Sequence, residues 1–327
     1  MRSTSLPSWS KRLLGLASVA VPPHAFAIEP GRLSYARFER SGGGFTVSAT
    51  RTLELPADGF HQGLLGGTLK EVGPFRDALA SLQRDLPGAV HAASLVLPDA
   101  WVRIAFSESG DLPANGRARE DILRFKLKRL VPFRVDDLRL TATEVTPLPQ
   151  QAEPRRLLLG FGLENLLGQL EGVFRDAGVH LGQITTASLA TLGAVTRGQS
   201  QAGRTTLVHV AGDGYTLLFA EGDEPLLCRY KPTAADLDAA AQAGMVRRDL
   251  RLTRNYLEDQ LGGSGVGRVV LAAHGPALSR WAEWIREGLE APVEELSFRH
   301  LAGIAGLESG DLFTLAPLAG AATREVE

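Results

Sequence analysis

The chain has 327 residues, which is enough for two domains of ordinary size, each with a core of its own. Hydrophobic residues make up 44% and charged residues 22% of the sequence, an ordinary composition for a globular protein. The formal net charge of −2 argues against a nucleic-acid binder, because such proteins usually carry a strongly basic face. The single cysteine, Cys228, excludes an internal disulfide and any cysteine-cluster metal site.

Two interpretations fit the N-terminal region. An apolar run over residues 13–21 follows two basic residues, and Ala25-Phe26-Ala27 matches a signal-peptidase site. Two prolines interrupt this pattern, however, and cleavage after Ala27 would remove most of a predicted strand over residues 25–28. We therefore expect residues 1–24 to be the N-terminal extension of an intact cytoplasmic chain, with secretion after cleavage at Ala27 as the alternative. The apolar run is too short to span a bilayer.

The first half of the chain alternates predicted strands and helices. Strands over residues 25–28, 33–40 and 45–55 form a meander with glycine-containing turns. A helix follows, because Phe75, Leu79, Leu82 and Leu86 recur at helical spacing. The other predicted elements are strands over 92–97, 101–106, 138–145 and 156–161, a basic helix over 119–130, a helix over 163–174, a return strand from 184 and a short helix over 187–196.

The second half of the chain repeats this order. A linker of glycine, serine and glutamine at 198–203 precedes strands over 204–210, 215–221 and 225–231, a helix over 234–261, a strand over 269–272 and a helix that carries Leu278, Trp281, Ile285 and Leu289. Two halves of the same order imply a duplicated α/β unit. The predicted domains are residues 25–200, with a small subdomain at about 90–150, and residues 201–327, with a helical insertion at about 232–263.

This order resembles the actin-like ATPase superfamily, and within it the family of the type IV pilus assembly protein PilM. Residues 95–98, the basic helix up to 131–133 and Asp136-Asp137 look like the small subdomain of that family, and residues 157–161 with 176–179 look like its next β–α–β passage. The resemblance implies an α/β, ribonuclease H-like duplicated fold of two domains with small inserted subdomains. The cytoplasmic domain of the type II secretion component GspL shares this fold.

An active member of this superfamily binds nucleotide phosphates at two β-hairpin turns. Small residues there let backbone N–H groups approach the anion, and a carboxylate in each turn helps to hold hydrated magnesium. The first turn of the PilM family typically reads Asp-x-Gly-Ser-Ser, whereas residues 29–33 of this chain read Glu-Pro-Gly-Arg-Leu. Glu29 could replace the aspartate, but Pro30 donates no N–H and Arg32 replaces a small residue. The alternative interpretation is an ordinary hairpin turn.

The other two nucleotide motifs are also altered. His209 stands where the family has an acidic residue in the second turn, and His274 stands beside the one glycine that the third motif keeps. Weakening of all three motifs argues against hydrolysis. We therefore predict a pseudo-ATPase with no catalytic residue and no required cofactor, with binding of ATP and magnesium as the alternative. The predicted vestigial nucleotide pocket consists of Glu29, Gly31, Ser34, Gly212, Asp213, Thr216 and Gly275.

No other pattern in the sequence points to an enzyme. The seven histidines show neither His-x-x-His nor His-Glu-x-x-His spacing, so no metal site is predicted. The glycine-rich run at 262–267 lacks the Lys-Ser/Thr pair of a phosphate-binding loop, and no Gly-x-Ser-x-Gly motif is present.

The resemblance implies a scaffold function. PilM lies at the cytoplasmic face of the inner membrane and binds the N-terminal tail of the membrane protein PilN in a groove beside the small subdomain. We expect a PilN-like partner and an apolar groove with polar anchors, with residues 95–97 and the basic helix 119–130 as candidate walls. A GspL-like secretion scaffold and an active ATPase or small-molecule kinase are the alternatives. Self-association is left open.

Overall fold

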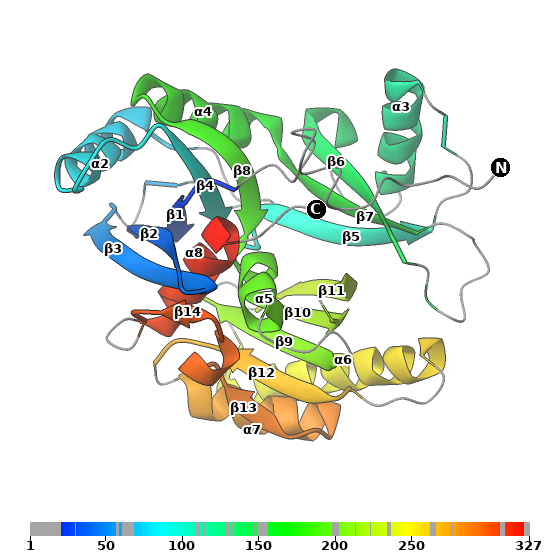
Figure 1. The fold of residues 1–327 in the computed structure, drawn as a ribbon. Coiled ribbons are helices and arrows are strands. Elements are labelled where there is room, and N and C mark those ends of the chain that lie inside the picture. Colours follow the sequence, from blue (N-terminus) through cyan, green and yellow to red (C-terminus); the bar gives the residue numbers. More distant parts are fainter. Residues whose placement is uncertain are drawn as a thin grey trace.

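The computed structural model describes residues 21–29, 31–56, 59–60, 69–108, 112–113, 115–128, 131, 134–146, 148, 156–197, 203–212, 214–222, 224–233, 237–261, 266–275, 277–307 and 311–323. Its described part is a mixed α/β structure in which two sheets are separated by a pair of central helices (Figure 1).

The two main sheets have the same internal order. The first contains β1 (His24–Glu29), β2 (Arg32–Ser41), β3 (Gly44–Glu54), β4 (Ala92–Leu97) and β8 (His180–Thr186), and the second contains β9 (Arg204–Ala211), β10 (Gly214–Glu221), β11 (Glu224–Pro232), β12 (Arg268–Ala272) and β13 (Val293–Glu295). The orders are β3-β2-β1-β4-β8 and β11-β10-β9-β12-β13. In each sheet the meander is antiparallel and the next two strands are added in parallel. The predicted duplication is therefore confirmed.

Alternation along β1 decides what covers each face of the first sheet. Phe26 and Ile28 join a core with α2 (Val72–Arg84) and α4 (Glu164–Asp176). Ala25 and Ala27 point to the other face, as alternate residues of a strand must. Their small side chains leave room for α5 (Ala187–Arg197) and α8 (Leu312–Thr323), which lie between the two sheets (Figure 1).

The second sheet is covered in the same way. Val208 and Val210 of β9 join a core with α6 (Ala239–Gln260) and α7 (Ala277–Leu289). Leu207 belongs to the central core around α5 and α8, and His209 shares its face of the strand. The alternation of β9 therefore turns a histidine toward the space between the two halves.

A small three-stranded sheet with one helix is inserted between β4 and α4. It contains β5 (Val102–Glu108), β6 (Leu138–Val145) and β7 (Arg156–Leu163) in the order β5-β7-β6, and α3 (Gly116–Leu127) covers one face. The predicted limits of this subdomain, 90–150, were wrong at both ends. β4 is an inner strand of the main sheet, as its nearly continuous apolar sequence suits, and β7 belongs to the small sheet.

The C-terminal segment returns to the first half of the molecule. β14 (Ile304–Ala305) pairs in parallel with β3, and α8 packs against β1, β2 and β4. The Ser94 hydroxyl donates a buried hydrogen bond of 3.0 Å to the Ala321 carbonyl of α8. The second domain predicted to run to residue 327 therefore ends earlier, because α8 is apolar all round and needs cover on every side.

The position of β1 argues against the secretion alternative. This strand lies between β2 and β4, and residues 25–28 are at most 3% exposed. Cleavage after Ala27 would remove residues 24–27, four of the six residues of the strand, and with them most of its hydrogen bonds to both neighbours. None of the helices within the described ranges has the length and apolarity that a bilayer-spanning segment requires.

A substitution at Gly320 of α8 can test the close packing of the two central helices. A Cβ placed there would lie 1.7 Å from the Ala190 carbonyl oxygen of α5, which is a backbone atom. Gly320→Ala is therefore expected to lower the free energy of unfolding by about 1–3 kcal/mol or more, measured by urea denaturation. The matched control is Gly193→Ala in α5, where a Cβ meets nothing within 4 Å and stability should stay equal or rise slightly. Equal stability of the Gly320 variant and the wild type would contradict this packing.

Candidate functional site

A cleft between the two halves holds a cavity of about 450 Å³. The β1–β2 hairpin, the end of β9 and the first turns of α5, α7 and α8 surround it. Its lining includes Ile28, Glu29, Arg32, Pro98, Asp99, Ala187, His209, Gly212, Gln242, His274, Arg280, Trp281, Phe313 and Pro317. The cleft is therefore the place where the sequence predicts the nucleotide pocket.

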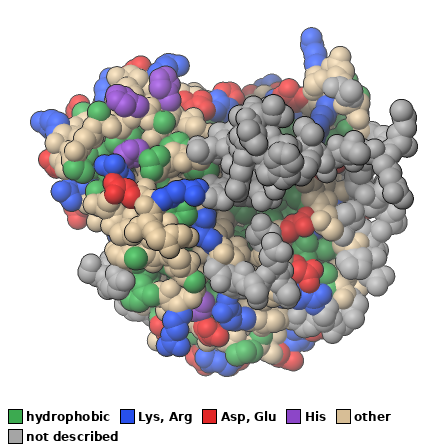
Figure 2. Space-filling view, in the orientation of Figure 1, with side chains coloured by type: hydrophobic (Ala, Val, Ile, Leu, Met, Phe, Trp, Pro, Cys, Tyr) green, Lys and Arg blue, Asp and Glu red, His purple; other side chains and the backbone are tan. Residues whose placement is uncertain are grey.

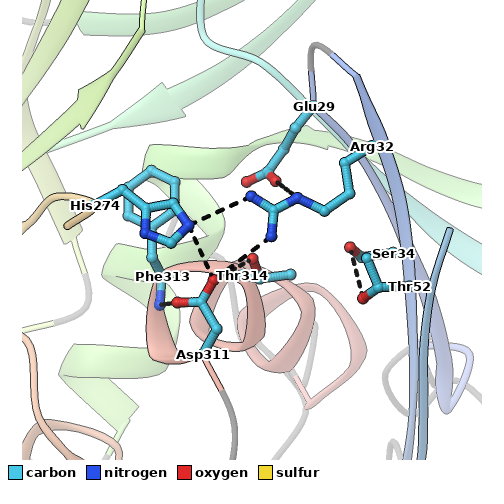
Figure 3. A network of polar contacts seen from close by, with 8 residues as sticks. All are labelled: Glu29, Arg32, Ser34, Thr52, His274, Asp311, Phe313 and Thr314. Atoms are coloured by element: carbon cyan, nitrogen blue, oxygen red, sulfur yellow. Dashed lines mark hydrogen bonds and ion pairs between the residues drawn. The ribbon is translucent and has the colours of Figure 1, made fainter. Parts of the chain in front are cut away.

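An arginine from the first hairpin turn occupies the centre of a charged network in this cleft (Figure 3). Arg32 Nε lies 3.1 Å from a Glu29 carboxylate oxygen, and its Nη1 lies 3.7 Å from Asp311. His274 Nε2 lies 3.1 Å from Asp311 and 3.3 Å from Arg32 Nη2. Asp311 also caps α8, because its carboxylate accepts hydrogen bonds from the Phe313 N–H and the Thr314 hydroxyl.

This network neutralises the acidic groups of the cleft with side chains of the protein. Burial raises the pKa of the Glu29 carboxyl, and the nearby Arg32 guanidinium partly offsets that increase. Glu29 and Arg32 come from the first hairpin, whereas His274 follows β12 of the second sheet. His274, through its contacts with Arg32 and Asp311, therefore links the two halves across the cleft. The ion pairs of Arg32 are partly exposed, so each adds at most about 1 kcal/mol to stability.

A second, buried polar cluster forms the floor of the cleft. His209 Nδ1 lies 3.4 Å from one oxygen of Asp99, and the Ser188 hydroxyl donates a 2.6 Å hydrogen bond to the other. The His209 ring stacks on Phe313, with ring centroids 4.8 Å apart. Burial alone would raise the pKa of Asp99, but hydrogen bonds from His209, Ser188 and Thr186, together with the charge of His209, hold it below its ordinary value.

The arrangement of these three residues does not activate a nucleophile. A Ser-His-Asp hydrolase places the histidine between the serine and the carboxylate, so that the imidazole can take the hydroxyl proton. Here the Ser188 hydroxyl is bound to Asp99 instead, and His209 binds the same carboxylate from the other side. The cluster therefore serves to satisfy a buried carboxylate.

The structure brings only some of the predicted pocket residues to the cleft. Glu29 and Gly212 line it. Ser34 is 1% exposed, and its hydroxyl lies 3.3 Å from that of Thr52 in the neighbouring strand. Thr216 is buried opposite His209 in the β9–β10 ladder. Asp213 lies outside the described residues.

Two of the predicted pocket glycines have a structural reason to be glycine. Gly31, in the first hairpin turn, has φ of 81°, and Gly275, after β12, has φ of 53°. Both values lie in the left-handed region, where side chains with a Cβ are strained. These two residues are therefore explained by turn geometry without any contact to a nucleotide.

Sequence reasoning missed the cleft residues that come from distant parts of the chain. Asp99 follows Pro98 at the end of β4, and Ser188 lies in the first turn of α5. Asp311 precedes the last helix, where Asp-Leu-Phe-Thr is a readable capping signal. Nothing in the sequence indicates that Asp311 also meets Arg32.

The residues of the cleft do not fit a magnesium–nucleotide complex. Magnesium prefers carboxylate and water oxygens as ligands. In this cleft Arg32 already neutralises the Glu29 carboxylate, and the second sheet contributes the imidazole of His209 instead of a carboxylate. Within the described ranges, no cluster of three or more His, Cys, Asp or Glu side chains could hold a metal ion. The cleft therefore has the volume of a binding site, but its described residues offer no set of ligands suited to magnesium.

A second groove runs along β8 beside the small sheet and encloses about 330 Å³. β8 is the last strand of the first main sheet, so its outer backbone edge has no neighbouring strand in the described part of the chain. The walls are mostly apolar, with contributions from Val102, Ile104, Leu158, Phe161, Leu167, Leu181, Ile184 and Leu189. At the rim, Arg139 pairs with Glu164 at 2.6 Å and Glu171 at 2.5 Å, and these hydrogen bonds raise the pKa of its guanidinium.

Neither of the two segments predicted as walls of a partner groove lines the groove along β8. Residues 95–97 form part of β4, and both Leu95 and Leu97 are fully buried in the core of the main sheet. The basic helix, observed as α3, packs on the opposite face of the small sheet from the groove. Leu157 and Leu159 of β7 face α3, whereas Leu158 and Gly160 face the groove, as the alternation of a strand requires.

Comparisons with known proteins agree at the level of fold. No protein-family model and no curated protein matches the sequence. A chain of the PilM-PilN type IV pilus biogenesis complex matches with a TM-score of 0.71 at 15% identity, over 93% of this chain and 97% of that one. A Bacteroides thetaiotaomicron protein described as having an actin-like ATPase fold matches with a TM-score of 0.50 at 7% identity, over 90% and 95%. This chain has the actin-like ATPase fold.

The other structure that the sequence resembles also matches. The cytoplasmic domain of EpsL, an inner membrane component of the type II secretion system of Vibrio cholerae, has a TM-score of 0.50 at 9% identity, over 93% of this chain and 96% of that one. The expected resemblance to PilM and to a secretion component of the same fold is thus confirmed as a likeness of structure.

Asp99 gives a prediction about acid stability. Its folded pKa lies below the ordinary value of 3.8, so its stabilising contribution is present above about pH 4 and is lost as pH falls through the folded pKa. Asp99→Asn is expected to cost about 1.5–3 kcal/mol at pH 7, and the difference from the wild type should shrink as pH falls below 4 in urea denaturation. Asp311→Asn, which keeps a capping oxygen and is partly exposed, is the control and should cost less. A gap that stays constant with pH would contradict this assignment.

Proposed function

We propose that this chain is a non-catalytic scaffold of a type IV pilus inner-membrane assembly complex, whose groove along β8 binds the N-terminal tail of a PilN-like membrane protein. Support comes from the shared fold with a chain of the PilM-PilN complex over nearly the whole length of both chains. On this proposal the protein works at the cytoplasmic face of the inner membrane and is held there through its partner.

The position of Arg32 carries the non-catalytic part of the proposal. Its guanidinium lies between Glu29 and Asp311, in the hairpin turn that active members of the superfamily use for phosphate and magnesium. A cation fixed beside both carboxylates disfavours a divalent metal ion there, because like charges repel. On this proposal, the contacts of His274 with Arg32 and Asp311 link the two halves in place of a bound nucleotide.

The groove along β8 carries the partner part of the proposal. An extended tail could hydrogen-bond to the outer edge of β8 and place alternate apolar side chains against the walls of the groove. Gly160, Gly162 and Gly182 line this groove, and a Cβ at any of them would lie 3.0–3.3 Å from a neighbouring group of the chain, so larger side chains would crowd its walls. Arg139 and Glu171 at the rim provide the polar anchors that would fix the direction of the tail.

The alternative proposal is that this chain is a scaffold of a type II secretion system, as EpsL is a component of one, and binds a partner from that system. The greater likeness to the PilM-PilN chain, with a TM-score of 0.71 against 0.50, favours the pilus assignment.

Nucleotide titration tests the non-catalytic part. Calorimetric titration of the whole chain with ATP and magnesium is expected to give no saturable heat, and millimolar nucleotide should not raise the melting temperature. A parallel titration with EDTA in place of magnesium separates metal-dependent from metal-independent binding. Saturable, magnesium-dependent binding of ATP with a dissociation constant near micromolar would contradict the pseudo-ATPase proposal. It would not bear on the proposed binding of a tail in the groove.

A groove variant tests the partner part. Fluorescence anisotropy with a labelled N-terminal peptide of the PilN-like protein from the same genome is expected to give saturable binding to the wild type. Thr141→Arg should weaken it about tenfold or more, because Thr141 is exposed and an arginine there would fill an apolar groove with a cation. Thr50→Arg on β3, an exposed strand position away from the groove, is the matched control and should bind normally. Equal binding by both variants would contradict the assignment of the groove.

A further inference from the structure

The basic helix singled out by the sequence has no part in the groove, and its outer face has an unusual composition. Leu123 and Leu127 of α3 are buried against the small sheet. Phe125, on the opposite side of the helix, is 68% exposed, more than any other large hydrophobic residue in the described part of the chain. Ile122, one turn before Phe125, is 37% exposed. This face therefore presents an apolar centre to solvent.

Basic side chains flank this apolar centre on both sides. With about 100° per residue, Arg117 and Lys128 lie on one side of Phe125, and Arg119 and Lys126 on the other. Arg117, Arg119 and Lys128 form no ion pair with a described residue, and Lys126 donates to the Glu108 carbonyl. Asp121 lies within about 60° of Phe125 on the helix, and Asp136, which follows the helix in the chain, borders the same hollow as Phe125 and Lys128.

We propose that this face of α3 docks on an anionic membrane surface. An aromatic side chain between two rows of Lys and Arg is the arrangement of a helix that lies in the interface, with the ring among the acyl chains and the cations at the phosphates. Asn115 caps the first turn of the helix, and Arg124, which also pairs with Glu120 of the same helix, joins it to the Val135 carbonyl. The basic helix predicted from the sequence began at residue 119, later than observed, because the capping role of Asn115 was not recognised.

The shape of the molecule favours a membrane over a protein partner. α3 stands at the outer end of the small subdomain, and basic side chains project from that end of the molecule (Figures 1 and 2). A convex, projecting helix suits a flat surface better than a binding pocket. The net charge of the whole chain is −2, so attraction to an anionic surface must come from this local cluster.

The inference stands independently of the proposed tail binding, but the two are compatible. α3 and the groove lie on opposite faces of the same three-stranded sheet. A molecule seated on α3 would therefore hold the groove about one sheet layer from the membrane surface, within reach of a short tail from a membrane protein.

Vesicle co-sedimentation of the whole chain tests the proposal. The wild type is expected to bind vesicles of phosphatidylcholine with a quarter phosphatidylglycerol, to release them in high salt, and not to bind pure phosphatidylcholine. The double variant Arg117→Glu with Lys128→Glu should lower partitioning about tenfold or more, and Phe125→Ser should lower it several-fold. All three side chains are exposed, so the melting temperature should not change.

Two matched controls decide the outcome. Leu252→Ser on α6 removes another exposed apolar residue, 56% exposed, from an arginine-rich helix, and should leave partitioning unchanged. The double variant Lys11→Glu with Arg12→Glu removes the two basic residues that precede the apolar run over residues 13–21. It tests whether that segment, rather than α3, binds the vesicles. The proposal is overturned if the wild type does not bind anionic vesicles at low salt, if the α3 variants bind as the wild type does, or if the N-terminal variant alone abolishes binding. Failure of tail binding in the anisotropy experiment would leave this result unaffected.

Discussion

The structure depends on the close packing of two helices between two sheets. α5 and α8 meet through Gly320 and the Ala190 carbonyl, and small residues of the first sheet leave room for them. Because both helices are covered on every side, they join the two halves into one core, in which residues of β1, β9 and β12 meet. The position of the cleft follows from this packing, since the first turns of the same helices form part of its lining.

The acidic groups of the cleft are matched by basic side chains of the protein. Glu29 pairs with Arg32, and Asp99 lies beside His209. A buried or half-buried carboxylate needs a counter-charge or hydrogen-bond donors, and here the protein itself supplies them. Ion pairs that are individually weak thus set the electrostatic character of the site.

The small subdomain presents two different surfaces from one sheet. Alternate residues of β7 point to α3 and to the groove, so a single strand supports both. The groove is mostly apolar and is bordered by the edge of β8, which has no neighbouring strand in the described part of the chain, while the outer face of α3 combines Phe125 with basic side chains on both sides. A partner tail and a membrane surface could therefore be engaged at the same time without competing for residues.

The sequence by itself determined the strand and helix order and the duplication, because alternation, helical spacing and turn residues are local signals. The actin-like fold class followed from the resemblance of this order to a known superfamily. The sequence also singled out the hairpin turn that contains Glu29 and Arg32. The tertiary structure alone decided the partners of these residues: Asp311 meets Arg32 only because α8 returns to the first sheet, and Asp99 meets His209 only because β4 and β9 end at the same cleft. The same holds for the boundary of the small subdomain and for the side on which the basic helix packs. Contacts between distant segments depend on how the sheets and helices pack, and one sequence without its fold contains no local signal for them.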